Sequence, residues 1–259
     1  MDLAKLGVTS ITVDARGHGD SDWVPSKNYS FYHYRDDMIE IVEQISQQYG
    51  RAPILIGASL GGLSGMLAVG EKGAEIFSAL ILVDITPTMA PSGVDKIQAF
   101  MAANMRDGFA NVEEAADVIA AYMPNRPKPK SLDGLRKNLR QRDDGRFYWH
   151  WDPVFIRNIM SARQGDPDSQ ERQSAMLSQA AANLTLPLHL IRGGSSDLVS
   201  EEAVLHLRQL APHAEYTDIA DATHMVVGDA NDAFSAAIVD FLGRHHSSDT
   251  AQPHGTREL

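Results

Sequence analysis

Three residues with nucleophilic, acidic and basic side chains follow short apolar segments of the chain. Ser59 lies in the pattern Gly57-Ala58-Ser59-Leu60-Gly61, and Asp197 and His224 come after later apolar runs. A serine hydroxyl attacks a carbonyl carbon when a histidine takes its proton and a carboxylate holds that histidine in one tautomer. The pattern therefore predicts Ser59 as nucleophile, His224 as general base and Asp197 as the acid that orients the base.

The segment around Ser59 predicts a buried strand that turns directly into a helix. Residues 53–56 are apolar throughout, and apolar side chains recur at helical spacing from Leu63 onward. Such a reversal strains the serine backbone and brings the flanking backbone close together, which favours glycine two positions before and after the serine. The amide of Leu60, at the helix N-terminus, is then free to bind an oxyanion.

Asp84 is an alternative for the acid, because it ends a second continuous apolar run at residues 79–83. Asp197 follows two glycines closely and could instead be a turn or helix-capping residue. His224 differs from the other histidines because it falls between the last predicted strand and the last predicted helix. In an open α/β sheet the ligand lies at the carboxyl ends of the strands, so residues in these positions are expected to converge there.

Composition limits the classes of function. Of 259 residues, 43% are hydrophobic and 22% charged, which suits one large globular domain with an inserted subdomain. A net charge of -11 argues against nucleic acid or an anionic membrane as the main partner, so a small-molecule substrate is expected. The chain has no cysteine, which excludes disulfides, a thiol nucleophile and cysteine-ligated zinc. We expect neither a metal nor a cofactor.

The apolar segments are too short for a membrane protein. None approaches the roughly 20 residues that span a bilayer, and the first residues do not form the apolar region of a signal peptide. We therefore expect a cytoplasmic protein. The sequence indicates no particular oligomeric state.

Strands and helices alternate in the first third of the chain. The pattern predicts strands over residues 8–13, 53–56 and 79–83, with a helix over 34–49 between the first two. Buried strands that alternate with helices are typical of a parallel sheet. The same alternation resumes at residue 186.

The middle of the chain has a different pattern. It predicts helices and no strand, including a basic helix over residues 131–142. The last residues are polar, contain Pro and Gly, and predict disorder. The predicted division is an α/β core over 1–90 and 183–244, a helical cap over 91–182 and a disordered tail over 245–259.

The predicted cap contains the densest aromatic cluster of the chain. Trp149, His150 and Trp151 could line a substrate pocket, or they could fill the core of the cap. Basic residues in the cap could bind a carboxylate-bearing substrate, or they could form a solvated helix face opposite an apolar stripe. These basic residues are Lys128, Lys130, Arg136, Lys137, Arg140 and Arg142.

Four segments together resemble the α/β-hydrolase superfamily, in particular its capped esterases, C–C hydrolases and cofactor-free haloperoxidases. The segments are residues 14–21, 57–62, 193–197 and 222–225. The resemblance implies a mostly parallel sheet with flanking helices and an inserted helical cap. Serine at position 59 disfavours the epoxide hydrolases and haloalkane dehalogenases of this superfamily, whose nucleophile is Asp.

The resemblance leaves more than one reaction open. Hydrolysis of a small carboxylic ester or related acyl substrate through an acyl-enzyme is the first expectation. C–C bond hydrolysis and cofactor-free perhydrolysis or haloperoxidation are alternatives with the same nucleophile. A third alternative is a catalytically impaired binding protein from a truncated hydrolase gene.

The chain departs from the resemblance before residue 8. In this superfamily, strands and a helix precede the segment that matches residues 14–21, and one of these strands carries a His-Gly loop that completes the oxyanion hole. The resemblance places that strand between residues 8–13 and 53–57. We therefore expect a sheet that lacks the usual N-terminal strands, and a native start about 40–50 residues upstream of Met1, judged from the size of strand–helix units.

Overall fold

The structure is a computed structural model that describes residues 2–5, 7–124, 131–166, 168–229 and 231–245. Lys128 and Lys130 lie outside the described residues. Of the predicted disordered tail 245–259, only His245 is described, and it ends helix α11 (Asn231–His245).

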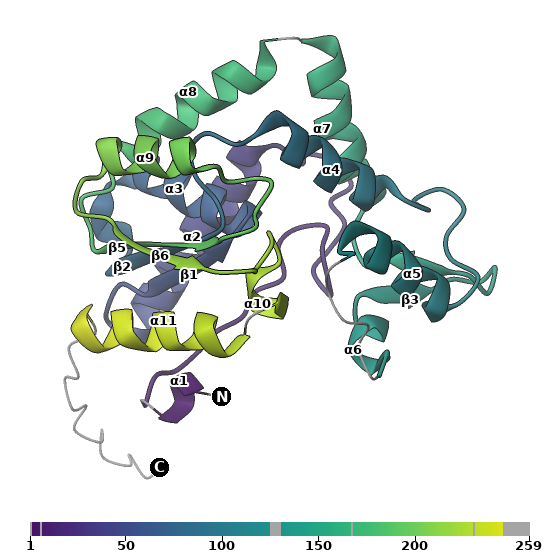
Figure 1. Cartoon of the computed structure of the whole chain (residues 1–259), viewed down its shortest axis with the longest axis horizontal. Coiled ribbons are helices and arrows are strands. Elements are labelled where there is room, and N and C mark those ends of the chain that lie inside the picture. Colours follow the sequence, from purple (N-terminus) through teal and green to yellow (C-terminus); the bar gives the residue numbers. More distant parts are fainter. Residues whose placement is uncertain (1, 6, 125–130, 167, 230, 246–259) are drawn as a thin grey trace.

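A parallel four-stranded sheet forms the centre of the molecule (Figure 1), in the order β1-β2-β5-β6. The strands are β1 (Ile54–Ala58), β2 (Ala79–Val83), β5 (Leu188–Gly193) and β6 (Glu215–Ile219). Every residue of β2 and β5 is buried. The continuous apolar sequence of β2 predicts this, whereas β5 also buries His189 and Arg192. Because the strands are parallel, all four carboxyl ends lie at one edge of the sheet.

Helices cover both faces of this sheet (Figure 1). Leu80 and Leu82 of β2 point into a core that also contains Met66 and Leu207, whereas Ile81 points into the core on the opposite face. The first face carries α2 (Phe31–Tyr49), α3 (Leu60–Lys72), α8 (Ser169–Ala181) and α9 (Glu201–Leu210), with the short helix η1 (Ala74–Ile76) after α3. The second face carries α11 and α1 (Asp2–Lys5), and α10 (Val226–Asp229) precedes α11.

A separate hydrophobic cluster lies in the inserted segment. Phe109, Val112, Leu139 and Trp149 are buried together there. The elements of this segment are α4 (Pro91–Ala102), α5 (Val112–Tyr122), α6 (Asp133–Arg136), β3 (Leu139–Gln141), β4 (Phe147–Trp149) and α7 (Pro153–Gly165). Helix α8, which the sequence analysis assigned to the cap, contributes Leu177 to the core beside the sheet instead.

The prediction of a helix over residues 131–142, and of no strand between 91 and 182, is wrong. Helix α6 has four residues, and β3 then pairs antiparallel with β4. Gly145, with φ of 78°, supplies the left-handed turn residue between the two strands. The turn brings an aromatic strand against β3, and this cross-strand pairing overrides the helical spacing of the local sequence.

The predicted strand over residues 8–13 is also wrong. This segment has no strand partner among the described residues, and Ile11 and Val13 are 49% and 53% exposed. β-Branched residues favour an extended chain, but a strand also needs a neighbour with which to exchange hydrogen bonds. A cavity of about 1770 Å³ lies where such a neighbour would run, lined by residues 8–13, β1 and the inner face of α2.

The open edge of β1 follows from this arrangement. Within the described part of the chain β1 pairs with β2 alone. The carbonyl of Pro53 and the amide of Ser59 point toward β2. Because successive residues of a strand alternate in direction, the backbone groups of Ile54, Ile56 and Ala58 face the cavity, and Ile56 is 36% exposed.

Hydrogen exchange tests this open edge. The amides of Ile56 and Ala58 should exchange about 100-fold faster than those of Leu55 and Gly57, because only the second pair is bonded to β2. Amide exchange followed by NMR measures all four sites in one sample. Leu55 and Gly57 therefore serve as internal controls for Ile56 and Ala58. Equal protection of the two pairs would show that a further strand covers this edge and would contradict the arrangement described.

Candidate active site

Ser59 lies at a sharp turn between β1 and α3. Its φ of 46° and ψ of -116° are rare for a residue with a side chain. Its carbonyl accepts the amide of Leu63 at 3.0 Å, which starts the first turn of α3. The side chain makes no capping bond to the helix. This geometry matches the strand–turn–helix predicted from the sequence and leaves the hydroxyl available at the carboxyl edge of the sheet.

Close backbone contact explains two of the glycines around Ser59. A Cβ on Gly57 would lie 2.6 Å from the amide nitrogen of Gly62, inside any allowed contact. A Cβ on Gly62 would lie 2.4 Å from Cγ2 of Ile85 and 2.9 Å from the carbonyl of Gly57. Gly61 differs, because a Cβ there would meet no atom within 4 Å. The predicted crowding two residues after the serine therefore falls on Gly62 rather than on Gly61.

Leu60 begins α3, so its amide has no acceptor within the helix. The positive end of the helix dipole lies at the same place and favours a negative charge. The amide of Leu60 is thus suited to bind an oxyanion formed next to Ser59. The side chain of Leu60 packs against the hydrophobic cluster that contains Tyr34 and Phe155.

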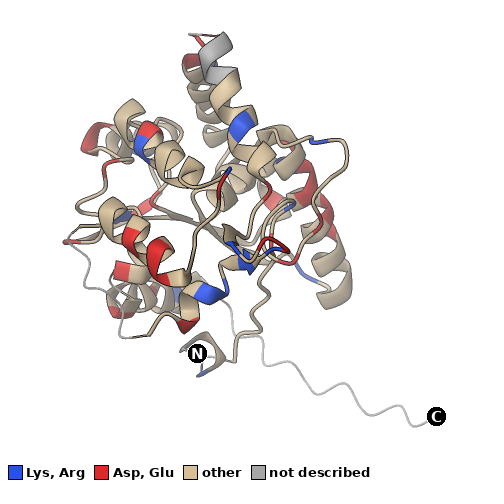
Figure 2. Ribbon diagram, turned by 90° about the vertical axis from the view of Figure 1, so that its right-hand side faces the viewer, with Lys and Arg blue, Asp and Glu red and all other residues tan. Residues whose placement is uncertain are grey.

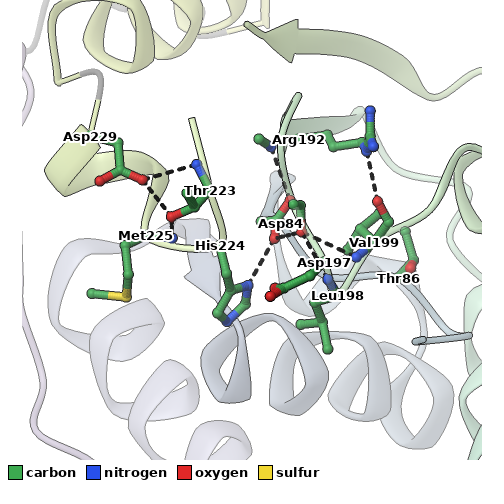
Figure 3. A network of polar contacts seen from close by, with 12 residues as sticks. Asp84, Thr86, Arg192, Asp197, Leu198, Val199, Thr223, His224, Met225 and Asp229 are labelled. Carbon is green, nitrogen blue, oxygen red and sulfur yellow. Dashed lines mark hydrogen bonds and ion pairs between the residues drawn. The ribbon is translucent and has the colours of Figure 1, made fainter. Parts of the chain in front are cut away.

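His224 is bound to Asp84. Its Nδ1 donates to Oδ2 of Asp84 over 2.8 Å, with side chains that are 9% and 0% exposed (Figure 3). The loop that carries His224 is fixed by Thr223, whose amide and hydroxyl both donate to Asp229. A hydrogen bond from Nδ1 to a buried carboxylate fixes the tautomer in which Nε2 is free to accept a proton.

Three donors hold the Asp84 carboxylate. The amide of Gly193 donates to Oδ1 over 2.9 Å, and the hydroxyl of Ser196 donates to Oδ2 over 2.6 Å. The third donor is His224. Asp84 also has a φ of 47°, which aims its side chain from the end of β2 across the end of β5. These bonds satisfy a fully buried negative charge, as burial requires.

The prediction that Asp197 orients His224 is wrong. Asp197 is 36% exposed and forms an ion pair of 2.6 Å with Lys96 of α4. Its carbonyl lies against Gly93, where a Cβ would come within 2.3 Å, so its backbone is held beside α4. Ser196, one residue earlier, takes the place next to Asp84. Asp84, the alternative considered from the sequence, is the carboxylate bound to His224.

The cavity described above reaches Ser59, where the inserted segment covers it. Helix α4 contributes Val94, Ile97 and Met101, and α7 contributes Phe155 and Ile159. These side chains are uncharged and mostly apolar. A substrate that reaches Ser59 therefore meets an apolar wall on the side of α4 and α7.

The predicted substrate contacts of Trp149, His150 and Trp151 are not found at this cavity. Trp149 lies inside the inserted segment, where its indole donates to the carbonyl of Ala103 and stacks on Trp151 at 4.9 Å. His150 and Trp151 line a second cavity of about 530 Å³, beside Asp20. Trp149 instead belongs to the hydrophobic core of the cap, which was the alternative interpretation of this aromatic cluster.

Two of the basic residues of the inserted segment are engaged elsewhere. Arg140 pairs with Asp20, and Arg142 lies 3.8 Å from the centre of the Tyr148 ring. In the ribbon of Figure 2, positions of Lys and Arg are interspersed with positions of Asp and Glu. Neither arginine lines the cavity at Ser59.

Two titratable side chains near the site are neutral at pH 7. Burial raises the pKa of Tyr122 to about 12, and the negative charges of Asp197 and Asp84 act in the same direction. Burial lowers the pKa of His18, whose Nδ1 donates to the carbonyl of Arg16 at 3.0 Å. His18 packs edge-on against Phe155 and therefore supports the wall of the cavity.

Within the described ranges the chain has neither a cluster of metal-binding side chains nor a membrane-spanning helix. No three His, Asp or Glu side chains lie in a group that could hold a metal ion. None of the helices there is both long and apolar enough to cross a bilayer.

Comparison with known proteins gives consistent matches over most of the chain. A family model described as the alpha/beta hydrolase family matches residues 1–237. An esterase from Mycobacterium tuberculosis is 24% identical over 232 residues, which is 88% of this chain and 72% of that protein. A 2-(acetamidomethylene)succinate hydrolase from Mesorhizobium japonicum is 25% identical over 234 residues, which is 90% of this chain and 78% of that protein.

Solved structures give the same picture of the fold. The crystal structure of E-2-(acetamidomethylene)succinate hydrolase superimposes with a TM-score of 0.71 at 23% identity, covering 89% of this chain and 80% of that chain. The M. tuberculosis esterase superimposes with a TM-score of 0.70 at 25% identity, covering 93% of this chain and 79% of that chain. The sheet and its flanking helices are therefore shared with these proteins.

The turn at Ser59 makes a prediction about stability. Gly62→Ala should lower the free energy of unfolding by about 1–3 kcal/mol, because the new methyl group overlaps Ile85 and the Gly57 backbone. Gly61→Ala is the matched control and should be neutral or stabilising by about 0.5–1 kcal/mol, since the site is open and alanine favours helix. Urea denaturation measures both. Equal effects of the two substitutions would contradict the packing described.

Proposed function

Because the chain belongs to the alpha/beta hydrolase family, we propose that it is a serine hydrolase that cleaves a small carboxylic ester through an acyl-enzyme intermediate. The observation that carries the proposal is the buried hydrogen bond from His224 to Asp84. A histidine held in this way, at the same edge of the sheet as a serine on a strained turn, is the arrangement that nucleophilic acyl transfer requires.

In the proposed reaction, Oγ of Ser59 forms a bond to the substrate carbonyl carbon while His224 takes the hydroxyl proton. The amide of Leu60 donates a hydrogen bond to the oxyanion of the tetrahedral intermediate. The intermediate then breaks the bond to the alcohol, which leaves with the proton from His224. Water repeats the two steps at the acyl-enzyme and releases the acid, and Asp84 stabilises the imidazolium throughout.

The apolar wall from α4 and α7 suits the uncharged acyl group of an ester. Val94, Ile97 and Met101 offer no charged partner to a carboxylate, and they suit an uncharged acyl group. The relatives include an esterase, which is consistent with this preference.

Covalent labelling tests the proposed nucleophile. A fluorophosphonate probe should label the wild-type protein and fail to label Ser59→Ala, because the probe forms its bond with an activated serine. Circular dichroism should confirm that both proteins are folded. The buried Ser64, whose hydroxyl donates to the carbonyl of Leu60, supplies a control variant, Ser64→Ala, that should still be labelled. Folded wild-type protein that the probe does not label would contradict the proposal and favour a binding protein without turnover.

Kinetics of two aspartate variants test the proposed acid. Asp84→Asn should lower kcat/KM for p-nitrophenyl acetate by about 10⁴-fold, because an amide no longer stabilises the imidazolium and favours the wrong tautomer. Asp197→Asn should stay within about threefold of wild type, since removing a half-exposed ion pair changes little. The reverse order of the two effects would make Asp197 the acid and contradict this account.

A further inference from the structure

We propose that Ser196 is a positioning residue, whose hydroxyl fixes the Asp84 carboxylate that orients His224. The contact is a hydrogen bond of 2.6 Å from Oγ of Ser196 to Oδ2 of Asp84. The catalytic consequence rests on the proposed function, whereas the positioning itself is a property of the three side chains.

The hydrogen bonds around Ser196 allow its hydroxyl proton to point in only one direction. Its Oγ accepts the amides of Leu198 and Val199, each at 3.2 Å. A serine oxygen has two acceptor positions and one proton. With both acceptor positions used by the backbone, the proton points to Asp84. The loop after β5 therefore orients this hydroxyl as a donor to Asp84 before the reaction begins. The hydroxyl does not need to rotate when His224 becomes charged.

The end of β5 and the loop after it together bind both oxygens of the carboxylate. The amide of Gly193 binds Oδ1, while Ser196 and His224 share Oδ2. A rotation of the Asp84 carboxylate out of its present plane would weaken all three bonds of a side chain that has no solvent exposure. The plane of the carboxylate is thus fixed, and with it the direction from which His224 is held.

Neighbours of Ser196 do not share this role. Ser195 is exposed, and Asp197 pairs with Lys96. Ser195→Ala is therefore a matched control, because it removes the same group one residue away without touching Asp84. Ser196→Thr keeps a hydroxyl at the same carbon and serves as the conservative variant.

An NMR measurement tests the positioning without reference to activity. The Nδ1 proton of His224 should give a resonance downfield of the amides, and His224→Gln should remove it. In Ser196→Ala this resonance should shift and broaden, because the carboxylate loses one of its three donors. Ser195→Ala and Ser196→Thr should leave it as in wild type. An unchanged resonance in Ser196→Ala would overturn the proposal.

Kinetics then test the consequence for the reaction. Ser196→Ala should lower kcat for p-nitrophenyl acetate about tenfold with KM within about twofold, because the change acts on the transition state rather than on substrate binding. Ser196→Thr should recover most of this loss, and Ser195→Ala should match wild type. If Ser196→Ala fails to fold, Ser196→Cys, which keeps a weaker donor, should lower kcat relative to wild type by less than about tenfold, and an unchanged kcat would overturn the proposal.

The outcomes separate the two proposals. A wild-type protein without activity that still shows the Ser196-dependent resonance would refute the hydrolase function and retain the positioning role. An active Ser196→Ala with unchanged kcat would refute the positioning role and retain the function. A loss confined to KM, or one that Ser196→Thr does not recover, would mark Ser196 as a structural residue of the loop and overturn the proposal.

Discussion

A buried negative charge is the constraint on which the rest of the site depends. Asp84 has no exposure to solvent, so its carboxylate needs donors from the protein. It receives them from the end of β5, from the loop after β5 and from His224. Removing one of these donors leaves the other two bound to an undercompensated charge, so the three are expected to act as a unit.

The order of strands explains why this carboxylate is Asp84. The sheet order β1-β2-β5-β6 places Ser59, Asp84, Gly193 and the loop to His224 at successive carboxyl ends. A side chain at the end of β2 therefore lies between the proposed nucleophile and the proposed base. The loop after β5 does not supply the carboxylate that binds His224. Its Ser196 binds Asp84 instead, while Asp197 pairs with Lys96. The open edge of β1 lies on the other side of Ser59, next to the large cavity.

The sequence predicts those features that depend on local patterns. The buried strand at 79–83 is a continuous apolar run, and the turn at Ser59 needs glycines that are visible in the sequence. The sequence does not predict features that depend on contacts between residues far apart in the chain. Residues 139–141 became a strand because 147–149 pair with them, and residues 8–13 did not because a neighbour is absent among the described residues. The choice between Asp84 and Asp197 depended on which carboxylate meets His224 in space, and spacing along the chain does not encode that contact.

The most direct test of this account is a crystal structure of the protein after reaction with an alkyl phosphonate ester. Such a group, bound covalently, has the tetrahedral geometry of the intermediate. We expect phosphorus on Oγ of Ser59, a phosphonyl oxygen within hydrogen-bonding distance of the Leu60 amide, and His224 bound through Nδ1 to Asp84. Phosphorus on another residue, or His224 bound to Asp197 in the adduct, would contradict the account.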